Sequence, residues 1–120
     1  MNTAYFYLTD EGGKLAHKLA AAHPGDIYNK ENFKENLRAG FGRYDSLVCI
    51  MATGIVVRIL APLIVHKTSD PAVVVLDQKG KYAISLLSGH LGGANDLARE
   101  MAVISGCLLY TSPSPRDGAT

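Results

Sequence analysis

Short apolar segments without helical periodicity recur along this chain, and they constrain its fold more than any other feature. Residues 4–8, 46–52 and 72–76 are such segments, rich in the aliphatic and aromatic residues that favour buried strands. Between them, apolar residues recur at helical spacing, most clearly in residues 33–41. Because strands and helices alternate, the sequence predicts an α/β fold whose mainly parallel sheet is flanked by helices.

The later half of the chain predicts a hairpin followed by a helix. Lys79 and Gly80 separate the apolar segment 72–76 from another at 82–87, so these two strands are expected to pair as a hairpin. Residues 88–93 then open a helix. Its expected buried side consists of Leu91, Ala94, Leu97, Ala98, Met101 and Ala102.

The length of 120 residues allows one domain, which we assign to residues 1–106. Residues 107–120 contain Pro113 and Pro115 and lack a periodic apolar face, and they resemble the translation of a sequencing-adaptor read-through. We therefore expect a non-native or disordered tail there, and a native protein that continues beyond about residue 106.

Composition and charge exclude several function classes. Lys and Arg total 12 against 11 Asp and Glu, so no basic surplus exists to neutralise nucleic-acid phosphates or to attract an anionic membrane. No apolar run approaches the roughly 18–20 residues that span a bilayer, and no secretory signal is recognisable. The two cysteines, Cys49 and Cys107, have the spacing of neither a disulfide framework nor a zinc module. We expect a soluble cytoplasmic domain, with Cys49 as an unreactive core residue.

Two glycine-containing loops join a predicted strand to a predicted helix. The first consists of Thr53 and Gly54, and the second spans residues 88–95. Such loops are expected to lie together at the carboxyl edge of an open α/β sheet, where backbone N–H groups at helix starts favour anions. Both loops also have a purely structural interpretation, in which Thr53 or Ser88 caps the following helix and the glycines permit close packing.

The second loop is the richer in functional groups. It contains Ser88, Gly89, His90, Gly92, Gly93 and Asn95. It has neither the Lys-Ser/Thr of a P-loop nor the glycine spacing of a dinucleotide site, which argues against a nucleotide ligand. Because imidazole titrates near neutral pH, His90 is the candidate general acid or base, with local hydrogen bonding as its alternative role. No spacing of His, Cys and carboxylates indicates a protein-bound metal.

Arg58 is the charged residue of an otherwise apolar predicted helix. Since an unpaired buried guanidinium is costly, Arg58 must meet a carboxylate or reach solvent. It is either an anchor for an anionic ligand, for which a guanidinium fork is suited, or part of a structural ion pair, for instance with Asp70, or a snorkelling side chain. His17 and His23 lie on or beside a polar helix face and are expected to be solvated.

Three elements in order give the chain a specific resemblance. They are Ala52-Thr-Gly-Ile-Val-Val-Arg58 with Ala61-Pro62, Lys67 with Asp70-Pro71-Ala-Val-Val-Val75, and Leu86-Leu-Ser-Gly-His-Leu-Gly-Gly-Ala-Asn95. Together with residues 5–20, they resemble the amino-terminal region of the cobalamin biosynthesis protein CbiG family, over about residues 4–105.

The resemblance implies an enzyme, a cobalt-precorrin-5A hydrolase of the anaerobic route to cobalamin. The implied reaction uses water to open the ring-A δ-lactone of this corrinoid-type tetrapyrrole and releases a two-carbon unit as acetaldehyde, so that a carbon–carbon bond is broken and cobalt-precorrin-5B results. Cobalt is part of the substrate, and the resemblance implies no separate cofactor. Full-length family members carry a further C-terminal domain, which we expect to be the partner of this one.

The acetate and propionate arms of such a substrate suggest roles for the candidate residues. His90 would assist the addition of water to the lactone or protonate a leaving oxygen. The remaining candidates would contact the substrate: Thr53, Gly54, Arg58, Asp70, Ser88, Gly89, Gly92, Gly93 and Asn95. One alternative function is a corrinoid-binding module without catalysis of its own, and another is a nucleotide-binding α/β domain.

Overall fold

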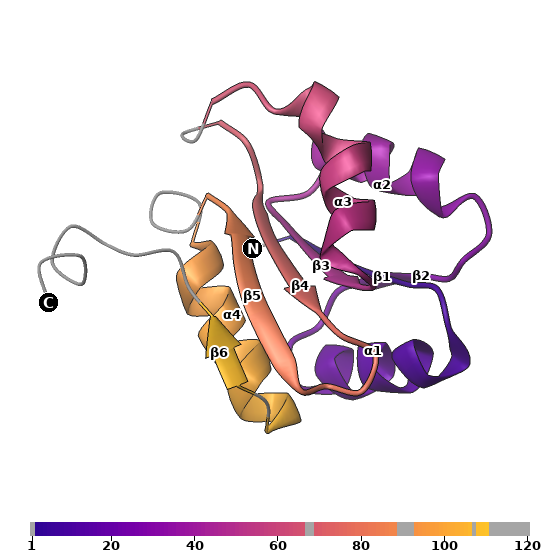
Figure 1. Ribbon diagram of the computed structural model, residues 1–120, viewed down its shortest axis with the longest axis vertical. Coiled ribbons are helices and arrows are strands. Elements are labelled where there is room, and N and C mark those ends of the chain that lie inside the picture. The colour runs from indigo at the N-terminus through magenta and orange to yellow at the C-terminus, as the bar shows by residue number, and fades with distance from the viewer. Residues whose placement is uncertain (1, 67–68, 89–92, 107, 111–120) are drawn as a thin grey trace, which may run out of the picture.

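The computed structural model describes residues 2–66, 69–88, 93–106 and 108–110, and within them one sheet is covered by helices on both faces (Figure 1). The strands are β1 (Thr3–Tyr7), β2 (Asp26–Tyr28), β3 (Ser46–Ile50), β4 (Ala72–Leu76), β5 (Tyr82–Leu87) and β6 (Leu108–Tyr110). The helices are α1 (Asp10–Ala22), α2 (Phe33–Phe41), α3 (Thr53–Leu60) and α4 (Ala94–Ser105), and a 3-10 turn, η1 (Ala61–Leu63), follows α3. The predicted α/β fold is confirmed.

The strands of the sheet lie in the order β2-β1-β3-β4-β5-β6. β1 pairs in parallel with β2 and β3, and β3 pairs in parallel with β4. β5 runs antiparallel to β4, and β6 is parallel to β5. The mainly parallel sheet with one late hairpin is therefore as predicted. The parallel strands β1 to β4 define two edges, an amino edge where they begin and a carboxyl edge where they end.

Two helices cover each face of the sheet, and a separate apolar cluster fills each layer. α1 and α4 pack together on one face, over a cluster that includes Tyr5, Leu19 and Met101 (Figure 1). α2 and α3 pack together on the other face, over a cluster that includes Phe6 and Leu60. Because β3 and β4 lie between the two layers, they are buried at every position, which explains why their sequences do not alternate between apolar and polar residues.

Helices α1 and α3 begin in different ways. Thr9 caps α1, since its Oγ1 accepts a hydrogen bond of 3.0 Å from the backbone N–H of Gly12. α3 begins differently: its N-cap is Ala52, which has no capping side chain, and Thr53 already belongs to the helix. The interpretation of Thr53 as a helix cap is therefore wrong.

The C-terminal segment contains a strand that the sequence did not predict. Leu108–Tyr110 form β6 beside β5. A strand of three residues next to a proline-rich segment carries no periodicity, so it left no recognisable pattern. Residues 107 and 111–120 lie outside the described residues, and the expected non-native or disordered tail stays a prediction there. Among the described helices, none is long and apolar enough to cross a bilayer.

Candidate functional site

The two loops that the sequence singled out lie on opposite edges of the sheet. Thr53 and Gly54 follow β3 and stand at the carboxyl edge. Ser88 follows β5, whose last residue, Leu87, pairs with Val73 near the start of β4, so Ser88 stands at the amino edge. The expectation that both loops meet at the carboxyl edge is wrong. A hairpin reverses the direction of its second strand, and this reversal carries the loop after β5 to the other edge.

At the amino edge, Ser88 and Asp70 are bonded to each other. Ser88 Oγ donates a hydrogen bond of 3.2 Å to the backbone carbonyl of Asp70, and the Asp70 carboxylate accepts one of 2.9 Å from the backbone N–H of Val65. The carbonyl of Ser88 accepts from the N–H of Ala94, but the N-cap of α4 is Gly93, so Ser88 does not cap the helix as its structural interpretation held. Both Asp70 and Ser88 thus fix the conformation of this edge.

The remaining residues of the second loop are only partly described. Gly89, His90 and Gly92 lie outside the described residues, and their roles stay predictions. Gly93 has a φ of 83°, in the left-handed region that favours glycine. Oδ1 of Asn95 is buried and has no hydrogen-bond partner within the described part of the chain. A buried oxygen of this kind is stabilised when a donor reaches it, whether from protein, water or ligand.

At the carboxyl edge, the first turn of α3 is open to its surroundings. Gly54 is exposed, and a Cβ added to it would meet no atom within 4 Å. Packing therefore does not require a glycine there. The same open space lets another molecule approach the backbone of Thr53 and Gly54, as the predicted role demands.

Arg58 lines a cavity between α2 and α3 that contains two further basic side chains. The cavity has a volume of about 230 Å³ and is lined by Lys34, Arg38, Ile55, Arg58 and Ile59. Lys34 and Arg38 lie four residues apart, which places them on one side of α2. The spacing of the other three residues likewise places them on one side of α3. Packing of α2 against α3 brings the two sides together.

The basic groups of this cavity have no acidic partner among the described residues. Among all the described residues, the ion pairs are His23–Glu100 and Asp96–Arg99, and neither involves a residue of this cavity. The ion pair of Arg58 with Asp70 that the sequence left open is therefore not formed, and Arg58 is exposed. Lys34 and Arg38 were not among the predicted site residues, although their spacing on the predicted helix 33–41 is a usable signal.

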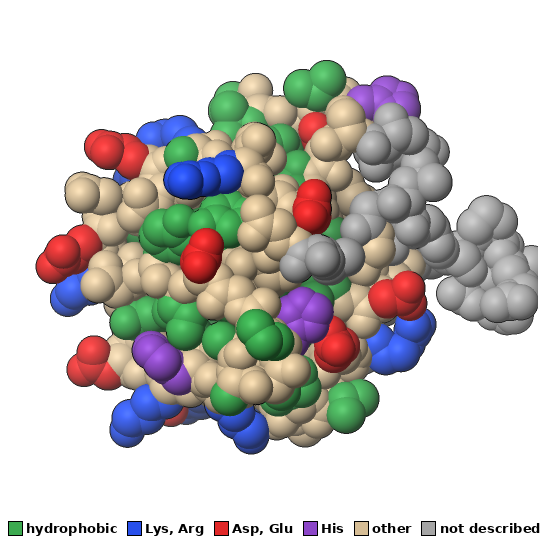
Figure 2. All heavy atoms as spheres, turned by 180° about the vertical axis from the view of Figure 1, so that it is seen from behind, with side chains coloured by type: hydrophobic (Ala, Val, Ile, Leu, Met, Phe, Trp, Pro, Cys, Tyr) green, Lys and Arg blue, Asp and Glu red, His purple; other side chains and the backbone are tan. Residues whose placement is uncertain are grey.

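On one face of the molecule the charges are mixed. Figure 2 shows acidic and basic side chains interspersed over one face of the molecule, with hydrophobic patches between them. On that face, the described residues form no continuous basic surface of the kind that tracks a nucleic-acid backbone.

His23 is held by hydrogen bonds rather than merely solvated, so the expectation for this residue is wrong. Its Nδ1 lies 2.5 Å from Glu100 Oε2, and its Nε2 lies 3.3 Å from Thr3 Oγ1, which in turn bonds Ser46 Oγ at 2.9 Å. A cavity of about 270 Å³ beside the ring is lined by His23, Gly93, Asp96, Leu97 and Glu100. Because both ring nitrogens are engaged and both hydroxyls are buried, this group connects α1, α4, β1 and β3 and presents no nucleophile.

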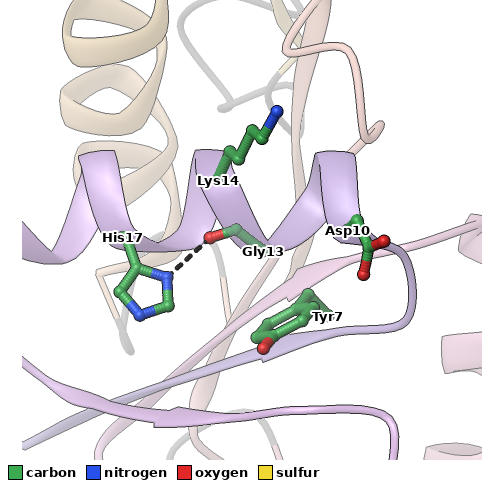
Figure 3. A pocket seen from close by; sticks show the side chains of 5 residues that line it. All are labelled: Tyr7, Asp10, Gly13, Lys14 and His17. Atoms are coloured by element: carbon green, nitrogen blue, oxygen red, sulfur yellow. Dashed lines mark hydrogen bonds between the residues drawn. The ribbon is translucent and has the colours of Figure 1, made fainter.

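A larger and shallower cavity, of about 470 Å³, lies beside α1 (Figure 3). It is lined by Tyr7, Asp10, Gly13, Lys14 and His17. The rings of His17 and Tyr7 lie on the same side of α1, with centroids 6.5 Å apart. His17 Nδ1 donates a hydrogen bond of 2.8 Å to the Gly13 carbonyl, so the proton of the neutral ring resides on Nδ1. His17 is exposed, as expected, and the cavity contains no residue of the predicted site.

Three buried titratable groups are structural. Burial raises the pKa of the Cys49 thiol to about 12, so it stays protonated at neutral pH and is unreactive, as predicted. Burial and the nearby Glu100 carboxylate raise the pKa of Tyr5. Burial, with hydrogen bonds to a second tyrosine and to Asp26, raises the pKa of Tyr44. Within the described residues, no cluster of three or more His, Cys, Asp or Glu could hold a metal ion.

Comparison with known proteins decides the family. The family model described as cobalamin synthesis G N-terminal matches residues 35–111, more than half of the chain. The chain belongs to the cobalamin synthesis G N-terminal family. The resemblance given by the three sequence elements is thereby confirmed, and all three elements, Arg58 included, lie wholly within the matched range.

Relatives and a solved structure agree with membership of the cobalamin synthesis G N-terminal family. A Salmonella typhimurium protein named cobalt-precorrin-5A hydrolase is 46% identical over 115 residues, which cover 86% of this chain and 33% of that protein. A Priestia megaterium protein of the same name is 55% identical over 62 residues, covering 52% of this chain and 17% of that one. The crystal structure of a Sulfolobus solfataricus homolog of cobalamin biosynthesis protein G has a TM-score of 0.75 at 30% identity and covers 90% of this chain and 35% of that one. The chain spans about a third of the length of the Salmonella relative.

Proposed function

We propose that this chain forms the N-terminal part of a cobalt-precorrin-5A hydrolase. In the proposed reaction, water adds to the carbonyl carbon of the ring-A δ-lactone, and the carbon–oxygen bond breaks to leave a carboxylate and a hydroxyl group. The two-carbon unit that carries the hydroxyl then leaves as acetaldehyde: its O–H proton is lost, and the electron pair of the broken carbon–carbon bond stays with the macrocycle. The product is cobalt-precorrin-5B. Cobalt is part of the substrate, and the proposal includes no protein-bound cofactor.

The similarity to named hydrolases carries this proposal. The Salmonella typhimurium hydrolase is 46% identical over a region that covers 86% of the chain. The surroundings of Arg58 also support the proposal, because an exposed guanidinium without an acidic partner in the described residues can bind a substrate carboxylate.

The opposite placement of the two loops changes the proposed division of roles. We assign Thr53 and Gly54, at the carboxyl edge, to substrate arms that approach the first turn of α3. We assign Ser88, Gly93 and Asn95, at the amino edge, to the part of the substrate nearer the reacting lactone, together with Gly89, Gly92 and Asp70. His90 belongs to the same sequence segment and keeps its proposed role, which is to take a proton from the attacking water or to protonate the leaving oxygen.

A corrinoid-binding module without catalysis of its own is the second candidate. It is favoured by the composition of the cavity around Arg58, where the described lining residues are basic or apolar and include no hydroxyl, thiol, imidazole or carboxylate. In this alternative, the residues of the full-length enzyme beyond this chain perform the hydrolysis. Both candidates require corrinoid binding, and they differ in the effect of changing His90.

Turnover by a full-length enzyme that begins with residues 1–106 of this chain distinguishes the two candidates. With cobalt-precorrin-5A as substrate, the proposal predicts one acetaldehyde released per macrocycle. It also predicts that His90→Ala lowers kcat by about a hundredfold or more, the size of a general acid–base contribution. His17→Ala is the matched control and should leave kcat within about twofold. Unchanged kcat in His90→Ala would favour the binding module, and failure of the intact enzyme to release acetaldehyde would contradict the hydrolase proposal.

A further inference from the structure

Three positively charged side chains line the cavity between α2 and α3. Lys34 lies in the first turn of α2, Arg38 lies one turn later, and Arg58 comes from α3. All three side chains are exposed, so they can contact a dissolved molecule without a change of fold. Ile55 and Ile59 add an apolar part to the lining.

Without a bound anion, the closeness of these positive charges destabilises the folded protein. Like charges one helical turn apart repel each other, as Lys34 and Arg38 do. Lys34 also lies near the N-terminus of α2, where the helix dipole is positive. The N-cap residue there, Asn32, makes no side-chain capping bond. Glu35 belongs to the same turn but comes within 4 Å of no basic group in the described part of the chain. An anion bound in the cavity would relieve this repulsion.

We propose that Lys34, Arg38 and Arg58 together bind neighbouring carboxylates of one polyanionic ligand. A guanidinium binds a carboxylate through two parallel hydrogen bonds, and a lysine ammonium contributes a point charge, so the three groups can serve two carboxylates. This inference rests on the proposed function, because the arms of the proposed substrate are carboxylates. It adds two residues, Lys34 and Arg38, as determinants of substrate specificity.

The size of the cavity indicates which part of such a ligand enters. Its volume of about 230 Å³ lies below the roughly 300–1,000 Å³ of pockets that enclose a whole drug-sized ligand. We therefore expect carboxylate arms to enter the cavity, with their methylene carbons against Ile55 and Ile59, while the macrocycle stays outside.

Titration of the 120-residue chain with two cobalt corrinoids tests the proposal. One corrinoid carries free carboxylate arms, and the other carries the same arms as amides. Binding is followed by the visible spectrum. We expect Arg38→Gln and Arg58→Gln each to weaken binding of the carboxylate form by about ten- to a hundredfold, and to change binding of the amide form by less than about twofold. Arg99→Gln, on α4 at the opposite face, removes the same charge and should change neither affinity.

Two further probes separate this proposal from the proposed function. Tricarballylate supplies neighbouring carboxylates without a macrocycle, and inorganic phosphate supplies a compact anion. We expect tricarballylate to compete with the carboxylate corrinoid more strongly than phosphate, and to lose this ability in Arg58→Gln. If the intact chain binds tricarballylate through these residues but binds neither corrinoid, the cavity proposal stands and the proposed function is contradicted. If the carboxylate corrinoid binds equally well to Arg38→Gln, Arg58→Gln and Arg99→Gln, the cavity proposal is overturned and the proposed function is unaffected.

Discussion

The imidazole of His23 lies 2.5 Å from the carboxylate of Glu100, across the interface between α1 and α4. The other ring nitrogen lies 3.3 Å from Thr3 Oγ1 at the start of β1. The ring therefore connects two helices that cover one face of the sheet to a strand within it.

This connection predicts a stability difference between two substitutions. His23→Ala removes both ring contacts and should lower the free energy of unfolding by about 1–2 kcal/mol. Glu100→Gln should lower it by less than about 1 kcal/mol, because the Glu100 side chain is 49% exposed and solvent screens its attraction for the ring. Urea denaturation measures both values. A His23→Ala variant as stable as the control His17→Ala would show that the connection contributes no stability.

Two glycines are expected to respond to alanine with opposite signs. A Cβ at Gly25 would lie 2.5 Å from the Thr3 carbonyl oxygen, so Gly25→Ala must displace the backbone of β1 and should cost about 2 kcal/mol or more. A Cβ at Gly54 meets nothing within 4 Å and lies in α3, so Gly54→Ala should raise stability by about 0.5–1 kcal/mol. Thermal unfolding should show a lower Tm for Gly25→Ala and a higher Tm for Gly54→Ala. Equal shifts in Tm would contradict the difference in backbone surroundings inferred for the two glycines.

Ser88 combines a left-handed backbone with a side-chain hydrogen bond, and two substitutions separate these features. Its φ of 57° is uncommon for a residue other than glycine, and its hydroxyl bonds the carbonyl of Asp70. Ser88→Ala keeps the strain and loses the bond, so we expect a loss of about 1 kcal/mol. Ser88→Gly loses the bond but relieves the strain, and its loss should be smaller. Greater destabilisation by glycine than by alanine in urea denaturation would contradict this reasoning.

The buried thiol of Cys49 predicts a dependence of stability on alkaline pH. Below the ordinary thiol pKa of 9.0, the group is neutral in both the folded and the unfolded chain. Between that value and the folded pKa of about 12, only the unfolded chain loses the proton, so the stability that this group contributes falls as the pH rises. Ionisation of this one group lowers the free energy of unfolding by up to about 1.4 kcal/mol per pH unit.

Comparison with Cys49→Ala isolates the contribution of the thiol. Tyr5 and Tyr44 also have raised pKa values, but they contribute equally to both proteins. The free energy of unfolding should therefore fall more steeply in the intact protein than in Cys49→Ala between pH 9 and about pH 10.5. Parallel curves over this range would mean that the thiol ionises as readily in the folded chain as in the unfolded one.

Much of the fold follows from local patterns in the sequence. The buried strands β3 and β4 were recognisable because strands covered on both faces are apolar throughout, and the turn at Lys79 and Gly80 marked the β4–β5 hairpin. β6 was not recognisable, since it has only three residues and is defined by its pairing with β5. Strand pairing depends on which distant segments of the chain meet, and the hydrophobic periodicity of a short segment does not indicate this.

The candidate site was predictable residue by residue but not as an assembly. Arg58 reaches solvent, which is one of the two outcomes that the cost of burying an unpaired charge allowed. The two loops lie apart because β5 runs antiparallel to β4, so the loop after β5 lies at the amino edge and not at the carboxyl edge. Lys34 and Arg38 entered the site through the packing of α2 against α3, a tertiary contact that a single helical pattern does not specify.

The kinetics of Arg58→Gln in a full-length enzyme with the proposed hydrolase activity give the most direct test of a carboxylate-binding role for this residue. Loss of an interaction made equally in the ground state and the transition state raises KM and leaves kcat unchanged. We predict that the KM for cobalt-precorrin-5A rises about tenfold or more, that kcat stays within about twofold, and that Arg99→Gln changes neither. A KM in Arg58→Gln equal to that of Arg99→Gln would contradict the account.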